Sequence, residues 1–142
     1  MSKYLTIALI SCVSQKATHK TEARNLYISS LFTKSLKYIE TILKPDKTYI
    51  LSAKYGLLKI DEVIEPYNET LNKKNREEQQ EWAKKVLLQI NKECNVKNDT
   101  FIFLAGKKYY QDLIHSLPNN KIIMENMPIG KRLQWLKKKL EV

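Results

Sequence analysis

The chain alternates short, continuous apolar runs with longer stretches in which apolar residues recur every three or four positions. A short apolar run suits a strand that is buried on both faces. Such runs cover residues 4–11, 48–53, 100–105 and, more weakly, 121–124. The longer stretches predict amphipathic helices over residues 22–43, 107–117 and 129–140, and one that follows Asn75 and ends near Cys94. This alternation predicts an α/β fold, a three-layer sandwich around a mostly parallel central sheet of about four strands.

Side chains within the predicted helices indicate which faces turn inward. Asn75 and Glu78 have the spacing of a capping box, with Asn in place of the usual Ser or Thr. The expected inward positions are Trp82, Val86, Leu87, Ile90 and Cys94, then Ile129, Leu133, Leu136 and Leu140. We expect Trp82, Trp135 and His115 to serve packing. No repeat or linker interrupts the pattern, so residues 1–142 are expected to form a single α/β domain.

Three predicted loops leave the carboxyl ends of strands, over residues 11–20, 54–70 and 106–110. Open α/β sheets bind ligands beyond these ends, where the strand order reverses. The loop at 54–70 is unusual, because an apolar strand runs directly into tyrosine, glycine, carboxylates and a Pro-Tyr pair. The sequence therefore predicts one pocket built from these loops.

The first loop carries small or titratable side chains at Cys12, Ser14, Lys16 and His19. It leads into a predicted helix, whose first backbone N–H groups can hold an anion. An ordinary polar connection with a half-buried cysteine explains the same residues. Cys12 has no His or acid beside it, so we do not expect thiol catalysis.

In the second loop, Tyr55-Gly56 indicates a tight turn, since glycine tolerates positive φ and close approach to a ligand. Lys54 and Tyr55 would then face the site. Asp61 and Glu65 are four positions apart, so one helical turn would put both carboxylates on one face. A desolvated carboxylate there can act as a general base. A solvated acidic face is the alternative explanation of this pair.

The third loop begins at Gly106 and opens a predicted helix. Lys107 and Lys108 at the helix start could meet phosphates, and Tyr109 or Tyr110 could stack on a base. Simple packing of a helix start is the alternative.

Charge adds a partner class to this picture. Lysine and arginine number 25 against 15 aspartates and glutamates, which gives a formal charge of +10. Such an excess favours a polyanion, and nucleic acid is the leading class. A composition produced by an AT-biased genome explains the excess as well. No apolar run reaches the roughly 18 residues of a membrane span, and the two cysteines form no metal or disulfide pattern. We therefore expect a cytoplasmic protein that binds no membrane, metal or cofactor.

The chain resembles a family of small bacterial and phage domains with no assigned reaction in four segments: ISCVSQK, ARNLYISSLF, LSAKYGLLKIDEVIEPYNETL and IGKRLQWL. The third segment is also similar to the YaaA peroxide-stress proteins, which share Tyr-Gly-Leu-Leu, then Asp, then a Pro-Tyr pair. Cys12, Ser14 and Lys16 resemble, at a different spacing, a stretch of archaeosine synthase, which transfers lysine to a deazaguanine base in tRNA.

These resemblances imply a uracil-DNA-glycosylase-like fold and a connection to nucleic-acid bases. The Gly-Gln-Asp-Pro-Tyr type of loop of true uracil-DNA glycosylases is missing from the sequence. A glycosylase is therefore a hypothesis here.

Two functions from different classes follow. The first is an enzyme that acts on the N-glycosidic bond or the base of a modified nucleotide in DNA or RNA, with DNA favoured over RNA. A carboxylate would activate water or a lysine would attack C1′. The candidates for catalysis are Asp61, Glu65, Lys16 and Lys54. The candidates for substrate binding are Cys12, Ser14, Arg24, Tyr55, Gly56, Tyr67, Gly106, Lys107, Tyr109 and Arg132.

The second function is a non-catalytic nucleic-acid-binding module of the YaaA-like type. In this hypothesis Tyr55 stacks on a base. The residues that would neutralise phosphates are Lys54, Lys107, Lys108 and Arg132.

Overall fold

The computed structural model describes residues 4–11 and 16–141, and its central sheet has five strands in the order β4-β3-β1-β6-β7. Their bounds are β1 Thr6–Ser11, β3 Lys47–Ser52, β4 Gly56–Lys59, β6 Thr100–Leu104 and β7 Asn120–Ile122. β1 pairs in parallel with β3 and β6, and β6 with β7, while β4 is antiparallel to β3. The predicted α/β fold with a mostly parallel sheet is confirmed, and β4 is the strand that the sequence did not predict.

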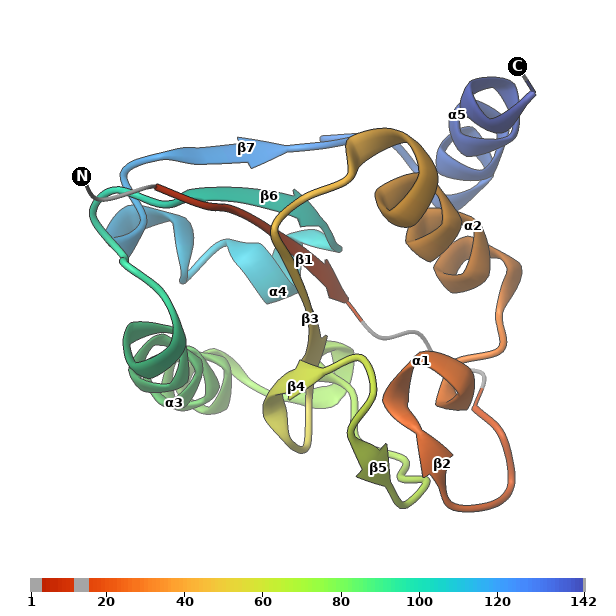
Figure 1. Ribbon diagram of the computed structural model, residues 1–142. Coiled ribbons are helices and arrows are strands. Elements are labelled where there is room, and N and C mark those ends of the chain that lie inside the picture. Colours follow the sequence, from red (N-terminus) through yellow and green to blue (C-terminus); the bar gives the residue numbers. More distant parts are fainter. Residues whose placement is uncertain (1–3, 12–15, 142) are drawn as a thin grey trace.

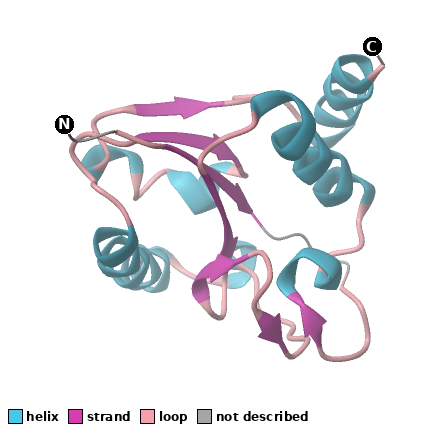
Figure 2. Ribbon diagram, viewed as in Figure 1, coloured by secondary structure: helices cyan, strands magenta, loops and turns pink. Residues whose placement is uncertain are grey.

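Helices cover both faces of the sheet (Figures 1 and 2). One face carries α2 (Ser30–Tyr38) and α5 (Ile129–Leu140), which pack against each other. The other carries α3 (Arg76–Glu93) and the short α4 (Lys107–Tyr110), joined by an edge-to-face contact between Trp82 and Tyr109. Burial agrees with this layering, because the middle residues of β1, from Ile7 to Ile10, are at most 1% exposed.

A second, two-stranded sheet forms a corner beside the main one. It pairs β2 (Thr21–Glu22) with β5 (Val63–Ile64), and α1 (Ala23–Leu26) follows β2 directly. The backbone N–H groups of Ala23 and Arg24 donate to the carbonyls of Glu62 and Ile60 at 2.7 and 2.8 Å. These bonds hold the turn after β4 against the start of α1.

The single helix predicted over residues 22–43 is wrong. The chain becomes extended at Tyr27 (φ −91°, ψ 110°), and α2 begins after Ser29, whose Oγ accepts a hydrogen bond from the Phe32 N–H at 3.2 Å. A π-helical turn, Ile39–Leu43, ends the segment. Ser29 is a good N-cap and a poor interior residue, and the break lets the Tyr27 ring enter the core at 1% exposure.

The loop predicted after β3 is in fact a hairpin. Gly56 adopts φ +78° and lies opposite Ser52, so the apolar Gly-Leu-Leu segment returns along β3 as β4. The glycine was predicted to form a tight turn, and it does, but the strand that follows it was not anticipated.

The helix predicted over residues 107–117 is also wrong, because α4 ends at Tyr110 and a separate turn covers Ile114–Ser116. Asp112, which follows α4, accepts two hydrogen bonds from the Arg76 guanidinium at 2.9 and 2.8 Å and is thereby tied to the start of α3. In α5, Ile129 does not turn inward, since it is 63% exposed.

Other local predictions are confirmed. Asn75 and Glu78 form the capping box in both directions, and α5 spans the predicted residues 129–140.

In the part of the chain that the structure describes, no helix is long and apolar enough to span a membrane.

Candidate functional site

The strand order creates a switch point between β1 and β6. The chain passes from β1 to β3 on one side and then crosses to β6 and β7 on the other. At such a point a crevice opens beyond the carboxyl ends of the strands. Ser11 ends β1 and Gly106 follows β6, and the Gly106 N–H donates to Ser11 Oγ at 3.3 Å. A pocket of about 560 Å³, here called the switch-point pocket, opens at this position.

Basic side chains dominate the charged lining of the switch-point pocket. Lys73 comes from the turn Leu71–Lys73, Lys107 and Lys108 come from α4, and Arg132 comes from α5. None of the described residues that line the pocket is acidic. The other lining residues are Ser11, Leu31, Thr70, Asn72, Gly106, Tyr109 and Ile129. Cations from three elements thus converge without a carboxylate among them, which creates a positive potential suited to an anion.

The pocket has a basic side and an apolar side. α4 packs against the turn Leu71–Lys73, where the Leu71 N–H donates to Tyr109 Oη at 3.4 Å, so the lysines of these two elements share one side. The packed pair α2 and α5 contributes Leu31, Ile129 and Arg132 to the other side, which is apolar apart from this one guanidinium. A ligand in this pocket would therefore meet lysines on one side, and hydrocarbon beside a single guanidinium on the other.

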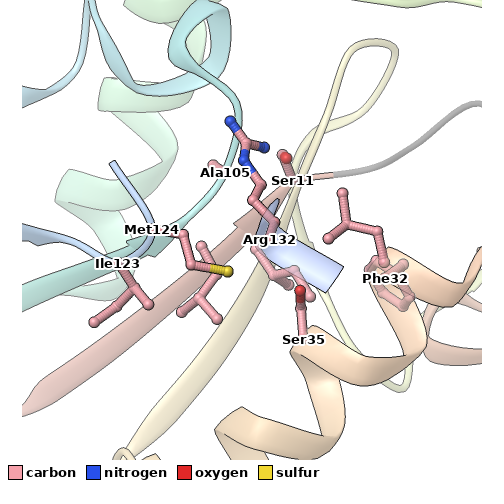
Figure 3. A pocket seen from close by; sticks show the side chains of 10 residues that line it. Ser11, Phe32, Ser35, Ala105, Ile123, Met124 and Arg132 are labelled. Atoms are coloured by element: carbon pink, nitrogen blue, oxygen red, sulfur yellow. The ribbon is translucent and has the colours of Figure 1, made fainter. Parts of the chain in front are cut away.

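Arg132 also borders a smaller cavity that adjoins the pocket (Figure 3). Its Nε donates to the Met127 carbonyl at 2.8 Å, which restricts the guanidinium. The smaller cavity measures about 20 Å³, enough for one water molecule, and Ser11 and Ser35 supply polar groups to its lining. Ser11 and Arg132 line both spaces, so the end of β1 and the start of α5 meet at this point.

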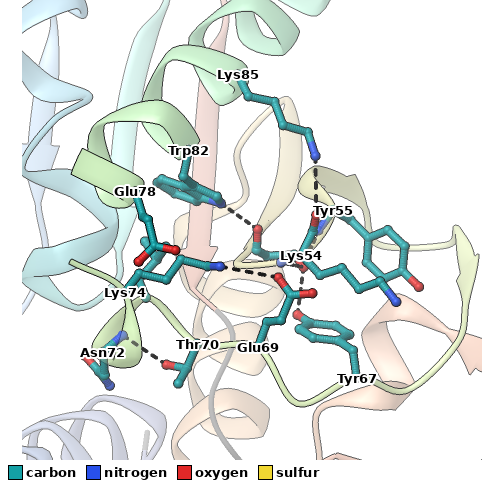
Figure 4. Close-up of polar contacts among 12 residues, drawn as sticks. Lys54, Tyr55, Tyr67, Glu69, Thr70, Asn72, Lys74, Glu78, Trp82 and Lys85 are labelled. Atoms are coloured by element: carbon teal, nitrogen blue, oxygen red, sulfur yellow. Dashed lines mark hydrogen bonds and ion pairs between the residues drawn. The ribbon is translucent and has the colours of Figure 1, made fainter. Parts of the chain in front are cut away.

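A second polar cluster, the Tyr67 network, lies at the end of β3 (Figure 4). Ser52 Oγ donates to Tyr67 Oη at 2.7 Å, and the hydroxyls of Tyr67 and Tyr27 are also 2.7 Å apart. Ser52 Oγ accepts from the N–H groups of Lys54 and Tyr55 at 3.3 and 3.0 Å. Ser52 is 0% exposed and its hydroxyl uses its donor and both acceptor positions, so the network is a fully bonded buried unit.

Two lysines lie against the aromatic rings of this network. Lys16 Nζ is 4.6 Å from the centroid of the Tyr67 ring, and Lys54 Nζ is 5.3 Å from that of Tyr55. The rings of Tyr55 and Tyr67 meet edge to face at 5.5 Å, and Tyr55 Oη donates to the Glu65 carbonyl at 3.4 Å. These residues therefore share one neighbourhood.

Two other lysines near the Tyr67 network are paired with carboxylates. Lys20 lies 4.0 Å from a Glu65 oxygen, and Lys74 lies 3.6 Å from a Glu69 oxygen. The switch-point pocket has no such acid in its described lining. The two places thus differ in net charge, and the pocket is the better site for a phosphate.

The structure divides the predicted site residues between these places. Gly106, Lys107, Tyr109 and Arg132 line the switch-point pocket. Around the Tyr67 network lie Lys16, Lys54, Tyr55, Tyr67 and the backbone of Glu65.

The remaining predicted site residues have separate positions. Asp61 is exposed in the turn between β4 and β5. Arg24 forms an ion pair with Glu40 at 3.3 Å, and Gly56 makes the hairpin turn. Cys12 and Ser14 lie outside the described residues.

Sequence reasoning missed several lining residues of the pocket. Thr70 and Lys73 follow the Pro-Tyr segment, and Thr70 Oγ1 accepts from the Asn72 N–H at 3.3 Å, a local capping pattern that the sequence could have shown. Leu31 and Ile129 reach the pocket because α2 packs on α5. No local pattern reports such a contact.

Burial also decides the chemistry of two groups outside the site. It raises the pKa of the Cys94 thiol to about 11 and that of the neighbouring Tyr49 to about 12. The raised pKa disfavours the thiolate form of Cys94 at neutral pH. Within the described ranges, no cluster of His, Cys, Asp and Glu side chains could hold a metal ion.

A family model covers nearly all of the elements described above. It matches residues 7–138 and is described as a family of unknown function, DUF6884. The chain belongs to the DUF6884 family. No curated protein sequence matches it.

The DUF6884 match includes both the switch-point pocket and the Tyr67 network. It extends from β1 into α5, so every described residue that lines the switch-point pocket, from Ser11 to Arg132, lies within the DUF6884 region. The Tyr67 network lies within it as well.

Proposed function

We propose that this protein binds nucleic acid or a nucleotide by holding a phosphate group in the switch-point pocket. The observation that carries the proposal is the convergence of Lys73, Lys107, Lys108 and Arg132 in a lining that has no described acid. Lysine and arginine at such a position neutralise phosphate and release its counterions. Leu31 and Ile129 add apolar surface that suits a base or sugar, whereas Tyr109 is only 5% exposed and its ring packs against Trp82.

The wider setting of the proposal is a cytoplasmic, single-domain protein with a uracil-DNA-glycosylase-like fold, related to the YaaA proteins and, more distantly, to archaeosine synthase. The position of the pocket is consistent with the open α/β sheet of this setting, because such sheets place their ligands at the switch point. DNA is proposed as the preferred polymer.

A salt titration with a fluorescently labelled single-stranded oligonucleotide tests the binding. Affinity should fall steeply as salt rises. The double variant Lys107→Gln, Lys108→Gln should weaken binding about tenfold at low salt and lower the slope of log affinity against log salt by about two.

The matched control removes the same charge elsewhere. Lys84→Gln, Lys92→Gln neutralises two exposed lysines of α3 that lie outside the pocket lining. It should leave affinity within about twofold. Equal losses in both double variants would show that only the net charge attracts the polymer. Absence of binding at low salt would refute the proposal.

A second candidate function is an enzyme that cleaves the N-glycosidic bond of a modified nucleotide. The observation that favours it is Lys16, whose ammonium lies against the Tyr67 ring shortly after β1 in the chain. In this reaction the neutral amine attacks C1′, the C1′–N bond breaks, and the base leaves with the bonding electrons and takes up a proton. The attacking nitrogen loses a proton, the sugar ring then opens by cleavage of C1′–O4′ with a proton taken up on O4′, and the resulting iminium would be hydrolysed by water. In a variant without the covalent step, Asp61 or Glu65 would activate water instead.

Borohydride trapping and base release separate these possibilities. A lysine nucleophile gives a reduced covalent complex with the substrate strand, and Lys16→Ala should abolish it while binding persists. Release of free base without trapping would indicate water activation by a carboxylate. If modified substrates give neither product nor adduct, the enzyme hypothesis fails and the binding proposal is unaffected.

A further inference from the structure

The division of the switch-point pocket into two sides restricts the ligand beyond its being an anion. Lys73, Lys107 and Lys108 stand on the side formed by α4 and the turn Leu71–Lys73. Leu31 and Ile129 stand on the side formed by α2 and α5, together with the guanidinium of Arg132. An inorganic anion would leave the apolar side unused. A ligand that uses both sides has a phosphate at one end and a flat or apolar body at the other.

The charge count also separates a terminal phosphate from an internal one. A phosphate monoester carries close to two negative charges at neutral pH, whereas each phosphodiester of a strand carries one. Three lysines and one arginine around a single pocket exceed what one phosphodiester needs. Converging cations of this kind therefore favour the more highly charged monoester.

Acidic residues lie on some of the segments that lead into and out of the pocket. The segment that leads into the pocket from the Tyr67 network carries Glu65 and Glu69, and both lie within 4.0 Å of a lysine ammonium. The first turn of α3, which follows the pocket's Lys73, contains Glu77 and Glu78. The surface around the pocket is therefore of mixed charge, since Glu65 and Glu69 are paired with lysines, and the cluster of cations without an acid is confined to the described pocket lining.

We propose, on the basis of the function proposed above, that the pocket selects a nucleoside bearing a terminal phosphate monoester, either as a free nucleotide or as the phosphorylated end of a strand. The lysines of the basic side hold the phosphate, and the base packs between Leu31 and Ile129. The pocket volume of about 560 Å³ lies in the range that encloses one small ligand, roughly 300–1,000 Å³. It suits a single nucleotide unit.

Competition measurements test this selection. A labelled oligonucleotide with a 5′-phosphate is bound first, and unlabelled nucleoside 5′-monophosphates, nucleosides and inorganic phosphate are added. The monophosphate should compete at a concentration at least about tenfold lower than the nucleoside or inorganic phosphate, because it alone uses both sides. Oligonucleotides with a 5′-phosphate, a 3′-phosphate or no terminal phosphate are then compared, which distinguishes a strand end from a free nucleotide as the source.

Two single variants probe the apolar side. Ile129 is 63% exposed and Leu88, on α3 outside the pocket lining, is 66% exposed, so replacing either by Ser disturbs the core little. Ile129→Ser should weaken the monophosphate about fivefold and leave inorganic phosphate unchanged, because it removes apolar contact area without charge. Leu88→Ser should change neither.

The results also separate this inference from the binding proposal on which it rests. Suppose that oligonucleotides with and without a terminal phosphate bind equally, with the same dependence on Lys107 and Lys108. The pocket then holds internal phosphates, and the terminal-phosphate inference is overturned while the binding proposal stands. Monophosphate competition no stronger than that of inorganic phosphate would overturn the inference in the same way. If no oligonucleotide or nucleotide binds at low salt, both fail.

Discussion

Removal of one hydroxyl, in Tyr67→Phe, tests the interpretation of the Tyr67 network. The Tyr67 hydroxyl accepts from Ser52 Oγ and pairs with the Tyr27 hydroxyl, each at 2.7 Å, and the residue is 8% exposed. Each buried hydrogen bond is worth a net ~1 kcal/mol, and a partner left without its bond adds a desolvation cost. The variant should therefore lower the free energy of unfolding by about 2–3 kcal/mol.

Urea denaturation followed by circular dichroism measures this change, and the slope with urea should stay the same. Tyr55→Phe is the matched control, because its hydroxyl makes a 3.4 Å bond to the Glu65 carbonyl at an exposed position. The control should cost less than about 0.5 kcal/mol. A double-mutant cycle with Ser52→Ala should give a coupling of about 1 kcal/mol. Equal effects of Tyr67→Phe and Tyr55→Phe would refute the reasoning.

Three other predictions concern the backbone, the predicted general base and alkaline pH. Gly56→Ala should lower the free energy of unfolding, measured by urea denaturation, by about 2–3 kcal/mol, because Gly56 has φ +78° and an added Cβ would collide with the Gln89 side chain. Gly130→Ala, with nothing within 4 Å of its Cβ, should stabilise by about 0.5 kcal/mol. Asp61→Asn should change the free energy of unfolding by less than about 0.5 kcal/mol and leave nucleic-acid affinity unchanged, since Asp61 is exposed and lies outside the pocket lining. If the variant instead loses base-releasing activity while its affinity is intact, Asp61 is the general base. Folding raises the pKa of Cys94 from 9.0 to about 11 and that of Tyr49 from 10.0 to about 12. Because the folded state holds these two protons more tightly, the two groups contribute fully to the free energy of unfolding below pH 9, and this contribution is lost as the pH rises toward 12. Tyr49→Phe should flatten that alkaline loss in unfolding measurements across this pH range.

The elements with a strong local pattern could be predicted from the sequence. The buried strand β1, the capping box at Asn75 and the bounds of α5 follow from periodicity and capping, which depend on neighbouring residues alone. The break at Tyr27 has one local signal, the N-cap Ser29, which the helical spacing of the apolar residues concealed. Its other reason is tertiary, since the Tyr27 hydroxyl meets Tyr67 from a segment forty positions later.

The sequence predicted the location of the candidate site at the sheet edge, but not the role of the loop at 54–70. The edge of the sheet follows from the order of elements, and Lys107, Tyr109 and Arg132, which the sequence singled out, do line one pocket there. The loop at 54–70 attracted the catalytic assignments because it is dense in polar residues. Much of that density turns out to be a hairpin and a buried hydrogen-bond network, in which Tyr67 bonds to Ser52. Polar residues next to an apolar strand can thus indicate a buried network as readily as a catalytic site.

The network and the pocket are nevertheless physically connected. Trp82 is 6% exposed, its Nε1 donates to the Ser52 carbonyl at 2.8 Å, and its ring meets the ring of Tyr109 at 5.6 Å. The segment that leaves Tyr67 also ends at Lys73 in the pocket lining. The end of β3 is therefore connected to Tyr109 of the pocket through the Trp82 ring, and to Lys73 of the pocket along the chain. Because rigid support of a binding site preserves its geometry, we infer that the Tyr67 network would support the proposed ligand binding although Tyr67 does not line the pocket.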